Sequence, residues 1–211
     1  MQVVLLNKTD HALSLLYKAA RTCYSPEVPS QIPEVSVDKM TALLNRLQQS
    51  GHHSVFEHAS FTFSVEGISR ACSHQLVRHR MASYSAQSQR YVQMDNRPDW
   101  IVPPSIFVDR EIYGPFERLM WDIEDCYHRL IAASVPAEDA RYVLPNATPT
   151  NIVVTMNLRE LVHFCSLRLC LRAQWEIRDV AYSMKQAIDE PFLSSFLVPP
   201  CKTCGQCKST D

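Results

Sequence analysis

The densest group of side chains that could do chemistry lies between residues 75 and 91. It begins Gln75-Leu-Val-Arg78-His79-Arg80 and continues through a polar stretch that holds Ser88 and Arg90. Arginine offers a charged planar fork and serine a short hydroxyl, and together they suit the oxygens of a phosphate. The segment therefore predicts an anion site. A solvated basic turn with serine caps is the alternative that the composition leaves open.

A second group is a set of cysteines near the end of the chain, at Cys201, Cys204 and Cys207. Their two overlapping Cys-x-x-Cys spacings can ligate zinc or part of an iron–sulfur cluster. The segment holds no fourth ligand, so Cys170, a histidine or another subunit would have to supply it. A redox-labile terminus without metal is the alternative.

The elements that position these residues alternate between strand-like and helix-like patterns. We expect strands over residues 2–6, 61–65 and 151–156. Helices are expected after Thr9 and after Ser36, each of which could act as the N-terminal cap, and Gly51 should end the second of these helices.

Further helices are expected over residues 68–78, 105–134, 157–169 and around 177–188. Gly114-Pro115 should kink or break the long helix, and Asn157 with Glu160 forms a capping box for the next one. The predicted fold class is α+β: a single compact domain over residues 1–195, with a mixed sheet and several helices. Residues 196–211 would form a cysteine-containing tail.

The bulk composition excludes several classes of function. The chain has 211 residues and a formal net charge of −1, so no global basic field would attract nucleic acid. No apolar run is long enough to span a bilayer, and the first residues have no signal-peptide pattern. We therefore expect a cytoplasmic protein with neither a nucleic-acid nor a membrane partner.

Taken whole, the segment Arg78-His79-Arg80, seven further residues and then Ser88 resembles the signature of the flavin-dependent thymidylate synthases. Three other segments are similar to that family in the expected order, and the resemblance spans roughly residues 1–195. They are Gly51-His52-His53-Ser54-Val55-Phe56-Glu57-His58, the stretch 140–145, and the stretch from Met156 through His163 and Arg168 to Ile177.

The resemblance implies an enzyme that reductively methylates dUMP to dTMP. FAD would be its cofactor, NADPH would reduce the FAD, and 5,10-methylenetetrahydrofolate would donate the carbon. It also implies a homotetramer whose active sites are shared between subunits.

The resemblance further assigns residues to two sites. The positions that match FAD contacts are His52, Ser54, Arg78, His79, Arg80, Asn157, Arg159 and His163. The positions that match dUMP contacts are Gln75, Arg78, Ala86, Gln87, Ser88, Gln89, Arg90, Arg141 and Arg168.

Within the dUMP set, Ser88 and Arg90 would hold the phosphate, and Arg168 is the catalytic residue that would polarise the pyrimidine ring. Ser88 could also be read as a nucleophile, but no obvious base lies beside it in the sequence to activate it. Ala86 replaces a glutamate that many members carry, and Ser85 replaces an asparagine, so the recognition of the ribose or base differs here.

Two other functions fit parts of the pattern. One is a flavin- and folate-dependent methyltransferase that acts on a uracil in RNA, which a larger basic surface would favour. The other is a non-catalytic nucleotide or flavin sensor with a metal-binding tail. Coupling of flavin oxidation to dUMP turnover would distinguish the synthase from the sensor.

Overall fold

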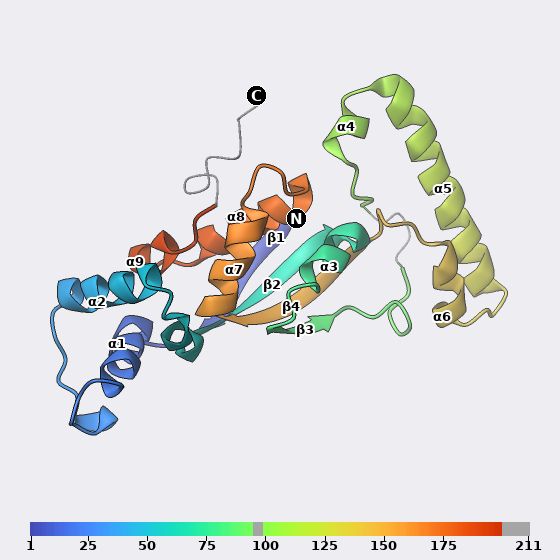
Figure 1. Cartoon of the computed structure of the whole chain (residues 1–211). Helices are drawn as coiled ribbons and strands as arrows, with labels where there is room; N and C mark the ends of the chain where they lie inside the picture. Colours follow the sequence, from blue (N-terminus) through green and yellow to red (C-terminus); the bar gives the residue numbers. More distant parts are fainter. Residues whose placement is uncertain (95–98, 200–211) are drawn as a thin grey trace. The chain divides into compact units, whose positions relative to one another are not determined.

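The computed structural model describes residues 1–94 and 99–199 of the chain (Figure 1). These residues divide into two compact units whose segments interleave along the sequence. The first unit contains Met1, Val65–Arg78 and Ser85–Ile152, and the second contains Gln2–Ser64, His79–Tyr84 and the chain from Val153 onward.

One four-stranded sheet has the order β1-β2-β4-β3. Its strands are β1 (Gln2–Lys8), β2 (Ser60–Ser69), β3 (Ala82–Ala86) and β4 (Pro149–Asn157). The expected strands at 2–6, 61–65 and 151–156 are thus confirmed, each longer than predicted, and β2 has twice the predicted length.

The register of the sheet corrects one expectation. In the second unit the Thr62 and Thr155 hydroxyls lie 2.9 Å apart, and in the first unit the Gly67 amide donates to Asn151 Oδ1 at 2.9 Å. As the residue number rises on β2 it falls on β4, so these strands are antiparallel. The Thr9 amide donates to the Ser60 carbonyl oxygen, which joins the end of β1 to the start of β2 in the same sense. For these two pairs the predicted mixed sheet is wrong.

Alternation along the strands builds the core. Phe61 and Phe63 of β2 and Val154 and Met156 of β4 are fully buried, while residues between them are partly exposed. Successive side chains on a strand point to opposite faces, so the sheet buries one face more deeply than the other.

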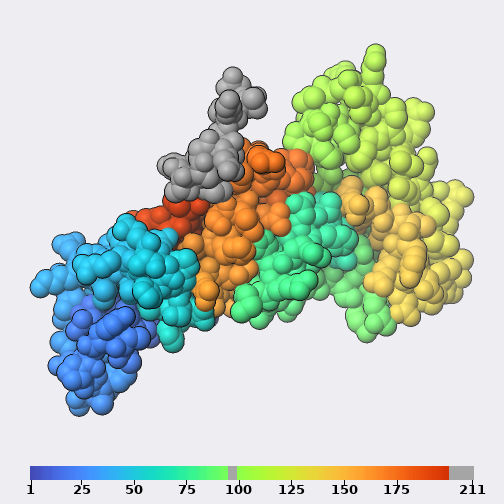
Figure 2. All heavy atoms as spheres, viewed as in Figure 1, coloured from blue at the N-terminus to red at the C-terminus, as the bar shows by residue number. Residues whose placement is uncertain are grey.

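The second unit holds most of the longer helices. They are α1 (Ala12–Thr22), α2 (Val37–Gln49), α7 (Leu158–Arg168), α8 (Trp175–Ala187) and α9 (Pro191–Ser195), with short 3-10 helices η1 (Pro29–Gln31) and η2 (His53–His58). Helices α1 and α2 pack side by side, drawn in blue and cyan in Figure 2. Helix α7 packs on both α8 and η2, and α8 packs on β1.

The first unit contains α3 (Arg70–Leu76), α4 (Pro104–Phe107), α5 (Arg110–Ala132), α6 (Ala137–Ala140) and the 3-10 helix η3 (Arg141–Val143). Helix α5 continues through Pro115, so the break that was one of the two expected outcomes does not occur. Pro115 lies early in the helix and removes only one backbone hydrogen bond there. The interruption comes earlier, where Asp109 Oδ1 accepts from the Glu111 amide at 2.9 Å and starts α5.

Of the two predicted helix caps, Thr9 is wrong and Ser36 is right in position only. The Thr9 hydroxyl accepts from the Ser60 amide at 2.9 Å, so it is committed to the sheet, and α1 starts only at Ala12. Ser36 does precede α2, but its side chain makes no capping hydrogen bond. Gly51 follows α2 with a φ of +80°, the left-handed conformation that glycine adopts after a helix, as predicted.

Within residues 1–94 and 99–199, no helix combines the length and the apolar character that crossing a membrane requires.

Candidate functional site

A cavity of about 460 Å³ lies in the first unit, a volume typical of small-molecule sites. Gln87, Ser88 and Gln89, three of the predicted dUMP residues, are among those that line it. Among the residues that the structure describes, Asp99 is the only cavity-lining residue with an ionisable side chain. The described side chains of the cavity wall therefore offer polar amides and hydroxyls rather than cationic groups for a phosphate.

Asn151 organises this edge of the cavity. Its side-chain oxygen accepts from the Gly67 amide, and its Nδ2 donates to Gln87 Oε1 at 2.9 Å. The Gln87 amide also donates to the Asn151 carbonyl oxygen. Gly67 has a φ of +63°, a backbone conformation that suits glycine at this close approach. These contacts fix the backbone just before Ser88.

Two arginines of the predicted dUMP set, Arg90 and Arg141, meet at Glu138, which belongs to α6. Arg90 approaches the Glu138 carboxylate through Nε at 2.9 Å and through a terminal nitrogen at 2.8 Å. Arg141 Nε donates to the Glu138 carbonyl oxygen at 3.0 Å. Burial and the neighbouring Arg141 lower the pKa of Arg70, so cationic groups are concentrated in this part of the unit.

The remaining dUMP positions of the first unit lie close by in sequence. Gln75 is on α3, Arg78 follows that helix, and Ala86 ends β3. Arg78 and Ala86 are exposed and Gln75 is half-buried, so all three are accessible to a ligand. The Ser88 hydroxyl accepts from the Arg90 amide at 3.2 Å, which ties the two predicted phosphate residues together.

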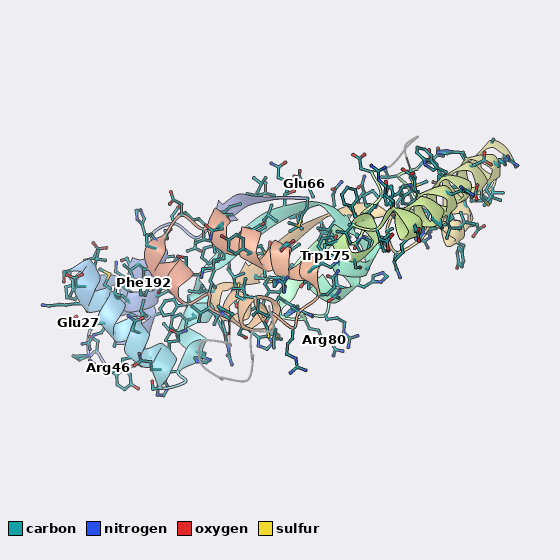
Figure 3. The ribbon with its side chains drawn as sticks, turned by 90° about the horizontal axis from the view of Figure 1, so that it is seen from above. Glu27, Arg46, Glu66, Arg80, Trp175 and Phe192 are labelled. Atoms are coloured by element: carbon teal, nitrogen blue, oxygen red, sulfur yellow. The ribbon has the colours of Figure 1, made fainter. Side chains whose placement is uncertain are left out.

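In the second unit, the residues after Arg78 alternate sharply in exposure. The side chain of His79 is only 4% exposed, whereas Arg80 is exposed and points away from the ribbon in Figure 3. The Tyr84 hydroxyl donates to the His79 carbonyl oxygen at 2.9 Å. The three residues of the Arg-His-Arg motif therefore do not share one environment.

The buried imidazole of His79 lies between two charged residues of α7. Arg168 Nε donates to His79 Nε2 at 3.0 Å, and His79 Nδ1 lies 3.4 Å from Glu160 Oε1. The ring also packs edge-on against Phe164, with the ring centroids 4.9 Å apart. Burial, Arg168 and then His163 lower the pKa of His79 to about 4, so the imidazole is neutral near pH 7.

Glu160 is held in an apolar setting as well. Burial raises the pKa of its carboxyl group, and His163 opposes that shift only in part. The predicted capping box is half right. Asn157 Oδ1 accepts from the Glu160 amide at 2.9 Å and starts α7, but the Glu160 carboxylate faces His79.

The other predicted flavin residues of this unit are accessible. His52, Ser54, Arg159 and His163 are all exposed. Arg159 pairs with Glu57, an ion pair that links α7 to η2. The structure thus brings Arg159 to the histidine-rich segment, and brings His163 beside His79 with ring centroids 5.9 Å apart.

The predicted metal ligands Cys201, Cys204 and Cys207 lie outside the described residues. Among residues 1–94 and 99–199, no cluster of three or more histidine, cysteine, aspartate or glutamate side chains could hold a metal ion.

Three residues of these clusters were not assigned to either site from the sequence: Asn151, Glu138 and Glu160. In the sequence, Asn151 only starts a predicted strand and Glu160 only belongs to a predicted cap. Glu138 carried no signal, because its partner Arg90 is 48 positions away and the contact depends on the fold.

Comparison with known proteins identifies similar chains over almost the full length. Residues 4–192 match the family model described as thymidylate synthase complementing protein. A flavin-dependent thymidylate synthase from Geobacter sulfurreducens is 48% identical over 212 residues, covering 98% of this chain and 90% of that one. The corresponding protein from Pyrococcus furiosus is 44% identical, covering 100% of this chain and 91% of the relative.

Two solved structures share the fold. Thymidylate synthase X from Helicobacter pylori, crystallised with FAD and dUMP, superposes with a TM-score of 0.78 at 21% identity, over 93% of this chain and 97% of that chain. A UMP/dUMP methylase from Streptomyces cacaoi, bound with 5-Br dUMP, gives a TM-score of 0.80 at 25% identity, over 92% of this chain and 93% of the other.

Proposed function

The chain belongs to the family of flavin-dependent thymidylate synthases, and from this premise we infer that it methylates dUMP to dTMP with FAD as its redox cofactor. The observation that carries the inference is the family match across residues 4–192. Both the segment 75–91 and the cluster of Glu160, His79 and Arg168 fall inside that match.

For dUMP, we propose a site made by Gln75, Arg78, Arg141, Arg168 and residues 86–90. Ser88 and Arg90 would hold the phosphate, since a hydroxyl and a guanidinium fork both suit phosphate oxygens. The concentration of cationic groups around Arg70, Arg90 and Arg141 supports this placement. Glu138, which engages Arg90 and Arg141, would orient the two arginines.

For FAD, we propose direct contacts from His52, Ser54, Arg78, Arg80, Asn157, Arg159 and His163, and an indirect part for His79, whose own side chain is buried. Bound FAD, once reduced, would supply the hydride of the reductive methylation. The chemistry of the set fits this cofactor, because exposed arginine and histidine side chains can stabilise the negative charge of a reduced flavin. His79 differs from the rest, since its burial leaves it to act mainly through its neighbours.

Arg168 is proposed as the catalytic residue. A guanidinium directed at N3 and O4 of the pyrimidine would stabilise negative charge on the ring and make carbon 5 more nucleophilic. No side chain is then required as a covalent nucleophile, which agrees with a phosphate-binding role for Ser88. Arg168 is half-buried at the end of α7, where cationic groups are favoured by the helix dipole.

We further propose NADPH as the reductant, 5,10-methylenetetrahydrofolate as the carbon donor and a homotetramer with shared active sites. Exposed apolar residues on α5 support an assembly: Ile112 and Leu119 are seven positions apart, so they share a helix face, and both are about half exposed. The cytoplasmic location expected from the sequence stays a prediction.

The direct test is to purify the chain with FAD and to measure dTMP formed from dUMP, methylenetetrahydrofolate and NADPH. Each component should be omitted in turn, and UMP should be offered as a competing substrate. We expect dTMP only when all components are present. Bound flavin without dTMP would contradict the proposal and favour the sensor or a uracil in RNA as the substrate.

A further inference from the structure

The contact between His79 and Arg168 defines the protonation state of the imidazole. A guanidinium is a donor only, so His79 Nε2 must accept the hydrogen bond from Arg168 Nε and cannot carry a proton. A neutral imidazole then carries its proton on Nδ1, which is the nitrogen that faces the Glu160 carboxylate. Both contacts are satisfied by a single tautomer of a neutral ring.

The surroundings of the ring hold that arrangement in place. Phe164 packs on its edge, the side chain is 4% exposed, and the backbone at His79 is fixed by the Tyr84 hydroxyl. Helix α7 carries Glu160, His163 and Arg168, so one element presents the charged groups to the imidazole. The ring therefore has little freedom to rotate or to exchange partners.

We propose that His79 is a positioning residue for Arg168, held in the Nδ1–H tautomer by Glu160. The bond to Nε fixes the plane of the guanidinium before substrate binds. Arginine has a long, flexible side chain, and catalysis by a positioned charge depends on orientation that is set in advance. The inference rests on the proposed role of Arg168 in activating dUMP.

This role differs from direct contact with flavin. In this chain the His79 side chain is almost fully buried, so it influences bound ligands through its neighbours Arg168 and His163. Removing it would then leave flavin binding largely intact while disturbing the chemical step.

The tautomer can be tested without any assumption about activity. Nitrogen-15 NMR of the full chain with labelled histidine separates protonated from unprotonated ring nitrogens, and loss of one signal in His79→Gln assigns it. We expect a protonated Nδ1 and an unprotonated Nε2 from pH 8 down to about 5, consistent with a pKa of about 4. A proton on Nε2, or titration near the ordinary histidine pKa, would overturn the proposal.

Two substitutions at the same position separate positioning from packing. In His79→Gln the side-chain oxygen reaches the place of Nε2 and can still accept from Arg168. In His79→Asn the amide reaches only the place of Nδ1, so the contact with Glu160 survives and the contact with Arg168 does not. His128, which lies beside Glu124 on α5, provides matched control variants to Gln and Asn.

We expect His79→Asn to lower kcat on the order of tenfold to a hundredfold with KM for dUMP little changed, because orientation is lost in the transition state. His79→Gln should restore most of that loss, and both variants should keep FAD and melt near the wild type. Equal losses in the two variants would overturn the proposal. Absence of dTMP from the wild-type chain would instead refute the proposed function, and the NMR result would still test the tautomer.

Discussion

At the scale of single residues, Arg168 is proposed to act on the substrate and not to stabilise the fold. Replacing Arg168 with Ala should leave FAD bound and lower kcat on the order of a hundredfold to a thousandfold, the usual cost of removing one group that stabilises developing charge. The flavin spectrum of the purified variant and its initial rate of dTMP formation check this. Turnover near the wild-type rate would remove Arg168 from the mechanism.

His79 also makes a pH-dependent contribution to stability whose sign can be worked out. Its pKa is about 4 in the folded chain and near 6.5 when unfolded, so between these values the unfolded state binds the extra proton. Protonation therefore favours unfolding as the pH falls. Wild type should lose stability relative to His79→Gln between about pH 6.5 and pH 4, and the difference should level off below.

Chemical unfolding of both proteins across that range measures the effect. The raised pKa of Glu160 acts in the opposite direction. Because this carboxyl is protonated more easily in the folded state, its contribution to the stability of the protein is lost as the pH rises. Glu160 is present in both proteins, so its contribution largely cancels in the comparison. A difference that does not change with pH would contradict the neutral, buried state of His79.

The same residue shows where reasoning from the sequence stops. The Arg-His-Arg motif marks the segment as functional, but it gives the three residues one shared role. The bond from Arg168, 89 positions away, and the burial of the middle residue depend on how α7 packs. The spacing of residues in the sequence predicts neither the hydrogen bond nor the burial.

At the scale of elements, local chemistry predicted most of the scaffold. Gly51 after α2, Asn157 before α7 and the alternation along β4 all lie where propensity and pattern place them. The failures share one physical cause. The Thr9 hydroxyl accepts from the amide at the start of β2 and does not cap α1, and α5 continues through Pro115. In both cases tertiary structure outweighs a single local preference.

Helix α7 provides a test at this scale, because its cap lies beside the proposed site. Asn157→Ala removes the acceptor for the Glu160 amide and should lower the free energy of unfolding by about 1 kcal/mol. Asn157→Asp keeps a side-chain oxygen there and should retain most of the stability. Denaturant unfolding of both variants measures these changes in the free energy of unfolding. Asp109→Ala, at the cap of α5, is the control. Equal losses in the Ala and Asp variants would argue against capping as the main role of Asn157.

At the scale of the whole molecule, the proposed residues are divided between the two units. Most of the dUMP set lies in the first unit, and Arg168 and most of the flavin set lie in the second. The sequence could name these residues through their resemblance to a family, but their spacing alone could not assign them to units. Interleaved chain segments cannot be deduced from local patterns.

The proposed assembly leads to a prediction about mass. Four copies of the 24.1-kDa chain should give a particle of about 96 kDa by light scattering at micromolar concentration. Leu119→Asp should reduce that mass if the exposed face of α5 lies in an interface, because a buried unpaired carboxylate is costly. Tyr24→Asp, at an exposed position in the second unit, is a control. A wild-type monomer would contradict the homotetramer.

If this chain methylates dUMP with electrons from FAD, a single turnover of the reduced enzyme must convert one dUMP for each flavin that is reoxidised. The FAD-loaded chain is reduced chemically, so that the identity of the natural reductant is irrelevant, and is mixed with dUMP and methylenetetrahydrofolate without oxygen. We predict that the flavin reoxidises and that the recovered nucleotide has the mass of dTMP. The amounts of oxidised flavin and of dTMP should be equal. Unchanged dUMP after complete mixing, or flavin that stays reduced, would contradict the account.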